Sequence, residues 1–75
     1  MKRVMLVGGG KIGVAITELL AATKDYTVTV ADRDAASLER MPRKDNVELR
    51  KITIENPVAF SKEVQGHDIV LMATP

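Results

Sequence analysis

Four short segments of the chain show the patterns of β-strands. Residues 4–7 form a continuous apolar run, and residues 68–73 are apolar after Asp68; such runs are typical of strands buried on both faces of a parallel sheet. Residues 27–31 are rich in β-branched side chains, which favour extended structure. Residues 47–52 alternate apolar and charged side chains, and this pattern predicts a half-exposed or edge strand.

Helical signals separate these strands. The segment 11–22 has apolar residues at helical spacing, and they predict one buried stripe made of Ile12, Ala15, Ile16, Leu19 and Leu20. Asp34 is a good N-cap for a short second helix that Pro42 closes. Asn56 followed by Pro57 combines an N-cap with proline at the first helical position, so a third helix is expected there.

A run of glycines lies between the first strand and the first helix. Gly8, Gly10 and Gly13 fit the spacing G-x-G-x-x-G. In such a loop the first glycine allows a sharp turn, the second lets a diphosphate approach the backbone, and the third allows close helix packing. The amides of the first helical turn, around Lys11 and Ile12, then face the diphosphate with the positive end of the helix dipole behind them.

An acidic residue in the right place distinguishes this loop from a merely flexible joint. Asp32 ends the second predicted strand and follows Gly13 by 19 residues, close to the expected spacing of about 20. A carboxylate there accepts hydrogen bonds from ribose hydroxyls and repels a 2′-phosphate, so the sequence favours NAD over NADP. Arg33 can stack on adenine or pair with a 2′-phosphate, and a solvated loop charge is the alternative. Within the glycine loop, Gly9 occupies the first free position of G-x-G-x-x-G, so it is interpreted as the one spare glycine, with no role of its own.

Further candidates follow the third and fourth strands. Thr53 and Ile54 are placed to flank the adenine, and Ala73 and Thr74 lie near the point where the cofactor crosses the sheet. Plain core and loop roles are the alternatives for all four. His67 has no visible partner for a triad or a metal, so it is expected to be solvated, and no catalytic or metal-binding residue is predicted.

The order β-α-β-α-β-α-β predicts an α/β fold with a parallel sheet and right-handed crossovers. With the glycine loop, it indicates a Rossmann-like, doubly wound sheet with strand order 3-2-1-4. Because such folds normally have six strands, residues 1–75 are expected to be a partial dinucleotide-binding domain, with the substrate domain absent from this chain. The fourth strand would then have an apolar edge, which predicts self-association or a homo-oligomer.

Composition excludes several classes of function. The chain is 45% hydrophobic and 28% charged, as in ordinary globular domains. A net charge of +1 and two aromatic residues argue against a nucleic-acid partner. The absence of cysteine excludes disulfides and thiolate chemistry and fits a reducing cytoplasm, where the protein is expected. The four-residue apolar run 4–7 is too short for a signal core or a membrane span.

The segments VMLVGGGKIGVAITELLA, YTVTVADRD, ENPVAF and HDIVLMATP together resemble the N-terminal cofactor domain of saccharopine dehydrogenase-like oxidoreductases. This group includes lysine 6-dehydrogenase-like enzymes, and the resemblance covers essentially the whole chain. It is most specific in VTVADR and in the ending Ala-Thr-Pro. Thr53 departs from the family, which often has an acidic residue there.

The resemblance implies that this domain holds NAD or NADP while a second domain binds an amino acid such as lysine or saccharopine. Hydride would pass between the nicotinamide and the carbon that bears the amine. No catalytic residue is implied within this chain. The implied cofactor contacts are Gly8, Gly10, Lys11, Ile12, Gly13, Asp32, Arg33, Ala73 and Thr74.

Two other functions share the same motifs. A regulatory domain that senses NAD(H) or another adenine nucleotide, like those of potassium transport proteins, has the same glycine loop and acidic residue but performs no chemistry. An α/β fragment that has lost its ligand would bind no nucleotide.

Overall fold

The computed structural model describes residues 1–52 and 57–73. Within these ranges, no helix is long and apolar enough to cross a membrane. Strands and helices alternate along the described residues, as the sequence predicts. Their bounds are β1 Lys2–Val7, α1 Lys11–Thr23, β2 Tyr26–Asp32, α2 Ala35–Glu39, β3 Val47–Lys51, α3 Pro57–Val64 and β4 Ile69–Met72.

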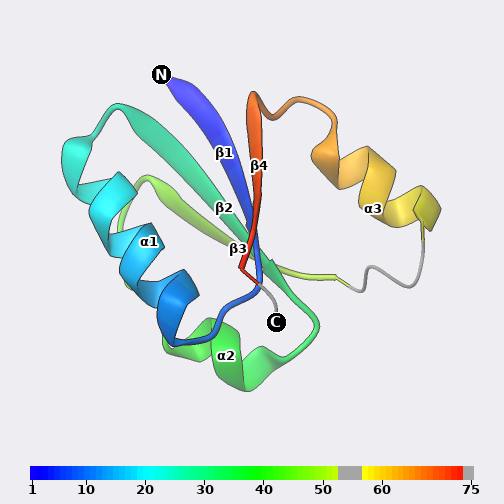
Figure 1. The fold of residues 1–75 in the computed structure, drawn as a ribbon, viewed down its shortest axis with the longest axis horizontal. Coiled ribbons are helices and arrows are strands. Elements are labelled where there is room, and N and C mark those ends of the chain that lie inside the picture. Colours follow the sequence, from blue (N-terminus) through cyan, green and yellow to red (C-terminus); the bar gives the residue numbers. More distant parts are fainter. Residues whose placement is uncertain (53–56, 74–75) are drawn as a thin grey trace.

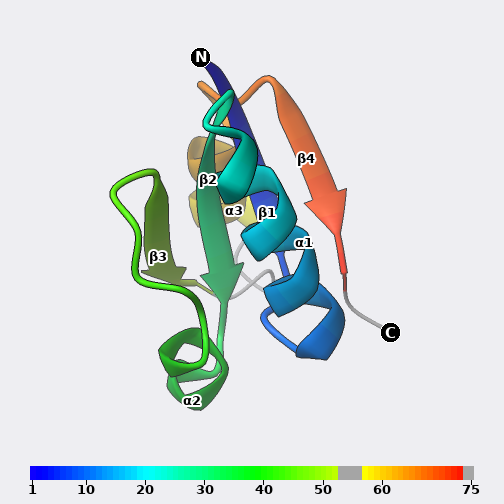
Figure 2. The same cartoon turned by 90° about the vertical axis from the view of Figure 1, so that its left-hand side faces the viewer.

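The four strands form one parallel sheet in the order β3-β2-β1-β4 (Figure 1), which confirms the predicted topology. Because the chain goes from β3 at one edge to β4 at the other, α1 and α3 lie on opposite faces of the sheet (Figure 2). The carboxyl ends of the strands meet at the end where α2 and the β1–α1 loop lie (Figure 2). This is the end at which parallel α/β sheets bind ligands.

One face of the sheet packs under α1 and α2. Leu6, Val28 and Val30 of the sheet form a buried cluster with Leu38 and Met41. The N-cap predicted for α2 is confirmed, since the carboxylate of Asp34 accepts a hydrogen bond from the amide of Ala36 at 3.0 Å. The short α2 thus starts directly beside the carboxyl end of β2.

The predicted buried stripe of α1 is wrong in part. The buried residues are Gly13, Thr17 and Ala21, which recur every fourth position, whereas the side chains of Ile12 and Leu19 are 68% and 69% exposed. Small side chains let the helix backbone approach β1 and β2 closely, so the larger apolar residues are left on the flank. Apolar periodicity marks the apolar arc of a helix but does not say which part of that arc faces the sheet.

The opposite face of the sheet packs under α3. Met5, Val7 and Ala31 form a second buried cluster, and Phe60 and Val64 of α3 pack against it. The burial predicted for the fourth strand is wrong, because β4 lies at the edge of the sheet and the side chain of Met72 is 56% exposed. The predicted edge position of β3 is confirmed.

Candidate functional site

The glycine loop turns out of β1 at the carboxyl end of the sheet. Its first residue continues the ladder with β2, because the amide of Gly8 donates to the carbonyl of Ala31 at 2.9 Å. Gly8 has φ +110, a conformation that side-chain-bearing residues rarely adopt. The sharp turn predicted at this glycine is therefore present.

Gly10 and Gly13 have different surroundings. A Cβ built at Gly13 overlaps the carbonyl oxygen of Gly8, so the first turn of α1 lies directly against the end of β1. At Gly10, the N-cap of α1, no described atom outside its chain neighbours lies within 4 Å of a built Cβ. A side chain would therefore fit at Gly10 without disturbing the described residues.

Gly9 is not the spare glycine that the sequence suggested. It is buried, and a Cβ built there would lie 3.1 Å from Oδ2 of Asp32, 3.2 Å from Cβ of Ser37 and 3.3 Å from Cε of Met41. Ser37 and Met41 were not predicted at the site. Apolar periodicity marks Met41 only as a core residue, and nothing in the sequence relates either residue to the loop.

Asp32 connects two loops through its carboxylate. Oδ2 accepts the amide of Gly9 at 2.6 Å, and Oδ1 accepts the amide of Asp34 at 2.8 Å. A carboxylate has about four acceptor positions, so each oxygen can accept a further hydrogen bond. The structure thus brings together the glycine loop and the acidic residue that the sequence predicted as its partner.

The remaining predicted residues surround this loop to different extents. Lys11 and Ile12 are exposed in the first turn of α1, and Arg33 is exposed beside Asp32. Ala73 follows β4 and donates its amide to the carbonyl of Val7 at 2.8 Å, which places it next to the start of the loop. Thr53, Ile54 and Thr74 lie outside the described residues.

These residues fit a dinucleotide. The approach to Gly10 is clear of described atoms, and the first amides of a helix have no intrahelical partner, so they can donate to an anion. The carboxylate of Asp32, which is bonded to the amide of the neighbouring Gly9, can accept further hydroxyl donors. An anion with a hydroxylated group attached is what this arrangement can bind.

His67 is not solvated, contrary to the sequence-based expectation. It is half-buried, and its Nε2 lies 3.1 Å from the hydroxyl of Thr29, a buried residue of β2. Its buried Nδ1 has no hydrogen-bond partner among the described residues. The pairing joins residues that are 38 positions apart in the chain, so no local pattern could indicate it.

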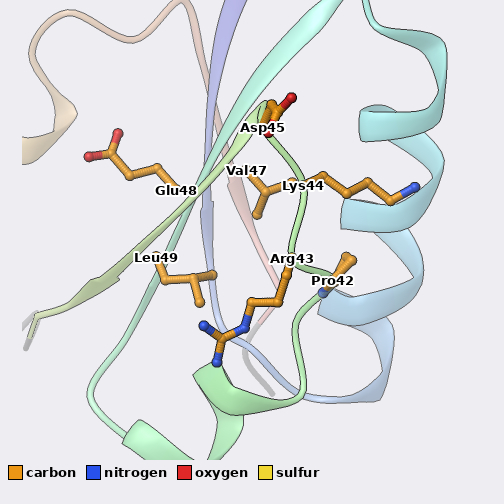
Figure 3. A pocket seen from close by; sticks show the side chains of 7 residues that line it. All are labelled: Pro42, Arg43, Lys44, Asp45, Val47, Glu48 and Leu49. Atoms are coloured by element: carbon orange, nitrogen blue, oxygen red, sulfur yellow. The ribbon is translucent and has the colours of Figure 1, made fainter.

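A pocket of about 530 Å³ lies elsewhere, between the loop after α2 and the edge strand β3 (Figure 3). It is lined by Pro42, Arg43, Lys44, Asp45, Val47, Glu48 and Leu49. None of the predicted site residues lines it, and its charged side chains are exposed. We assign the site to the glycine loop because the contacts of Asp32 converge there. The described residues contain no cluster of metal ligands.

Comparisons with known proteins agree with this geometry. The family model described as the saccharopine dehydrogenase NADP binding domain matches residues 4–75. The saccharopine dehydrogenase (NADP(+), L-glutamate-forming) of Saccharomyces cerevisiae is 27% identical over 74 residues, which are 99% of this chain and 17% of the yeast protein. The glycerol-3-phosphate dehydrogenase (NAD(P)+) of an Anaeromyxobacter species is 33% identical over 79 residues, covering 97% of this chain and 24% of that protein.

A solved structure, described as a Rossmann-fold NAD(P)-binding family protein from Shigella flexneri, superposes with a TM-score of 0.87 at 28% identity. The match covers 99% of this chain and 38% of that one. This chain thus spans only a minor part of the proteins it resembles. The open glycine loop, the parallel sheet and the family match over residues 4–75 agree, and the chain belongs to the saccharopine dehydrogenase NADP-binding domain family, as an NAD(P)-binding domain of Rossmann fold.

Proposed function

We propose that this chain is the cofactor-binding part of a dehydrogenase that acts on the CH–NH group of an amino acid such as lysine or saccharopine. The family match and the yeast relative support an amino-acid substrate. The observation that carries the cofactor site is the open space at Gly10, next to the glycine whose amide is bonded to Asp32. In this proposal, the substrate and the catalytic residues belong to a second domain.

Each predicted residue then has a distinct task. Gly8 and Gly13 shape the loop, and Gly10 lets the diphosphate reach the backbone. The amides near Lys11 and Ile12 donate to the phosphate oxygens. Asp32 accepts the ribose hydroxyls, Arg33 lies beside the adenosine, and Ala73 and Thr74 line the crossing point toward the nicotinamide.

We propose NAD as the preferred cofactor. The family description and the yeast relative name NADP, and the Anaeromyxobacter relative names both cofactors, so the preference rests on Asp32. A carboxylate that accepts ribose hydroxyls repels a 2′-phosphate at the same place. Calorimetric titration with NAD, NADP and ATP tests this. NAD should bind most tightly, an NADP preference overturns the role given to Asp32, and no binding by any of the three overturns the cofactor site.

The proposal that the substrate and the catalytic residues belong to a second domain has its own test. The chain supplied with NAD and with lysine or saccharopine should form no NADH, because hydride transfer requires a substrate site outside these residues. Turnover by the 75-residue chain alone would show that the catalytic residues are within it.

We also propose that copies of the chain associate through β4. This strand lies at the sheet edge, carries no charged side chain from Ile69 to Met72, and exposes Ile69, Val70 and Met72. Charged residues are a common protection of such edges. Sedimentation should show dimers at high concentration and monomers for Met72→Lys, with Val58→Lys on α3 as the control. A monomer at every concentration contradicts the proposal.

The cytoplasmic location expected from the sequence stays a prediction.

A further inference from the structure

The contacts that hold the glycine loop come from the next βα unit of the fold. The amide of Gly9 is bonded to Oδ2 of Asp32 at 2.6 Å, and the second oxygen of that carboxylate is bonded to the amide of Asp34 at 2.8 Å. The same side chain therefore fixes the β1–α1 loop to the start of α2. Hydrogen bonds to an ionised acceptor are shorter and stronger than neutral ones.

Met41 supports the loop from the buried side. Its side chain is 3% exposed, and its Cε lies 3.3 Å from a Cβ built at Gly9 and 3.6 Å from one built at Gly13. One methyl group thus packs against two glycines of the loop. Met41 lies just after α2, and Asp32 is bonded to the amide of Asp34 just before it. Both supports of the loop, Asp32 and Met41, therefore depend on the position of that short helix.

A loop with three consecutive glycines loses more backbone freedom on ordering than any other sequence of the same length. If the loop had to become ordered when a diphosphate binds, this loss would reduce the affinity. A loop that is already held in place avoids the loss. The two supports act on Gly9 and Gly13, on either side of Gly10, where the diphosphate approach lies.

We propose that Asp32 and Met41 are positioning residues that hold the glycine loop in the shape that binds a diphosphate. For Asp32 this role is separate from accepting the ribose hydroxyls. The inference rests on the proposed cofactor site. It predicts that Asp32 contributes to the binding of a diphosphate that has no ribose hydroxyls.

The test uses 2′,3′-dideoxyadenosine 5′-diphosphate, which keeps the diphosphate and lacks both hydroxyls. Asp32→Asn removes one negative charge, and by Coulomb repulsion alone this strengthens the binding of an anion. In the variant, however, the side chain has only one oxygen and one NH₂ group. In either orientation the NH₂ group faces one of the two backbone amides, that of Gly9 or that of Asp34, and this amide loses its acceptor. We expect binding to weaken about tenfold, the lower end of the range for one lost charge-assisted hydrogen bond.

Asp34→Asn is the matched control, because it removes the same charge two residues away and keeps an oxygen that can accept the amide of Ala36. It should bind the dideoxy diphosphate as tightly as the wild type or more tightly. Unchanged or tighter binding by Asp32→Asn as well would overturn the positioning role. Met41→Leu should bind the dideoxy diphosphate as tightly as the wild type, whereas Met41→Ala should bind it more weakly. Equal affinities in folded samples of these two variants contradict the role of Met41.

Hydrogen exchange of the ligand-free protein separates this inference from the proposed function. In Asp32→Ala, which removes both acceptor oxygens, the Gly9 amide should exchange about tenfold faster, as expected for the loss of one hydrogen bond. The Gly8 amide, which is bonded to Ala31, is the internal reference. If the wild type binds no nucleotide, the proposed function fails, and the Gly9 exchange rate still decides whether Asp32 holds the loop. An unchanged rate at Gly9 overturns the inference.

Discussion

The substitution Gly10→Ala should separate cofactor binding from folding. Gly10 has φ −75 and ψ −167, an extended conformation that alanine adopts without strain, and no described atom outside its chain neighbours lies within 4 Å of the added methyl. Alanine is a poorer N-cap than glycine by a few tenths to about 1 kcal/mol. It also reduces the entropy of the unfolded chain, which stabilises by about 0.4–1 kcal/mol. The two effects nearly cancel, so the free energy of unfolding should change by less than about 0.5 kcal/mol.

The effect on binding should be much larger. In the proposed cofactor site, the added methyl group blocks the approach of the diphosphate to the first-turn amides. A displaced diphosphate loses charge-assisted hydrogen bonds that contribute about 1.5–3 kcal/mol each. Losing one of them weakens NAD binding by about 10- to 150-fold. Calorimetric titration measures the affinity, and thermal unfolding followed by circular dichroism measures the stability.

Gly66→Ala is the control for a general effect of replacing a glycine. Gly66 has φ +86, so alanine is strained there, and the residue lies in the α3–β4 loop. Its stability should fall while the folded protein keeps its affinity for NAD. If Gly10→Ala binds NAD within twofold of the wild type, the methyl group does not block the diphosphate. If it is destabilised as much as Gly66→Ala, the substitution does not separate binding from folding.

The other predictions concern stability and are measured by thermal or urea unfolding. Thr17 is fully buried, and its hydroxyl has no partner among the described residues, so Thr17→Val should raise the unfolding free energy by about 1 kcal/mol. Lower stability would mean that the hydroxyl has a partner. Thr29→Val should have the opposite sign, a loss of about 1 kcal/mol, because it leaves Nε2 of His67 unpaired; a gain would show that this hydrogen bond does not stabilise the fold. The side-chain amide of Asn46 donates to the carbonyls of Ala21 at 3.0 Å and Tyr26 at 3.2 Å, so Asn46→Ala should cost about 1–3 kcal/mol. A change below about 0.5 kcal/mol would contradict it.

The elements of this fold could be predicted because each has a local cause. The apolar run before Gly8 and the β-branched segment before Asp32 are strands in the structure, and the N-cap at Asp34 starts α2. The strand order followed from the glycine loop together with the alternation of strands and helices. The juxtaposition of the loop with Asp32 followed from the parallel sheet, since carboxyl ends of neighbouring strands meet at one edge.

What could not be predicted depends on contacts between distant residues. Gly9 had no assigned role because its buried contacts come from α2 and from the end of β2. His67 was expected in solvent because its partner Thr29 lies on another strand. The buried face of α1 was predicted wrongly because it consists of Gly13, Thr17 and Ala21. These residues face the sheet because they are small enough for the helix to approach it closely, and a hydrophobic pattern does not indicate this.

The central claim is that the glycine loop and Asp32 together bind the diphosphate and ribose of a dinucleotide. Titration of the ¹⁵N-labelled chain with NAD, followed through the backbone amide resonances, tests it most directly. Saturable shifts are expected at Gly9 to Gly13 and at Asp32, while the resonances of the amides that line the pocket beside β3 stay unchanged. Shifts confined to that pocket, or no shifts at all, would contradict it.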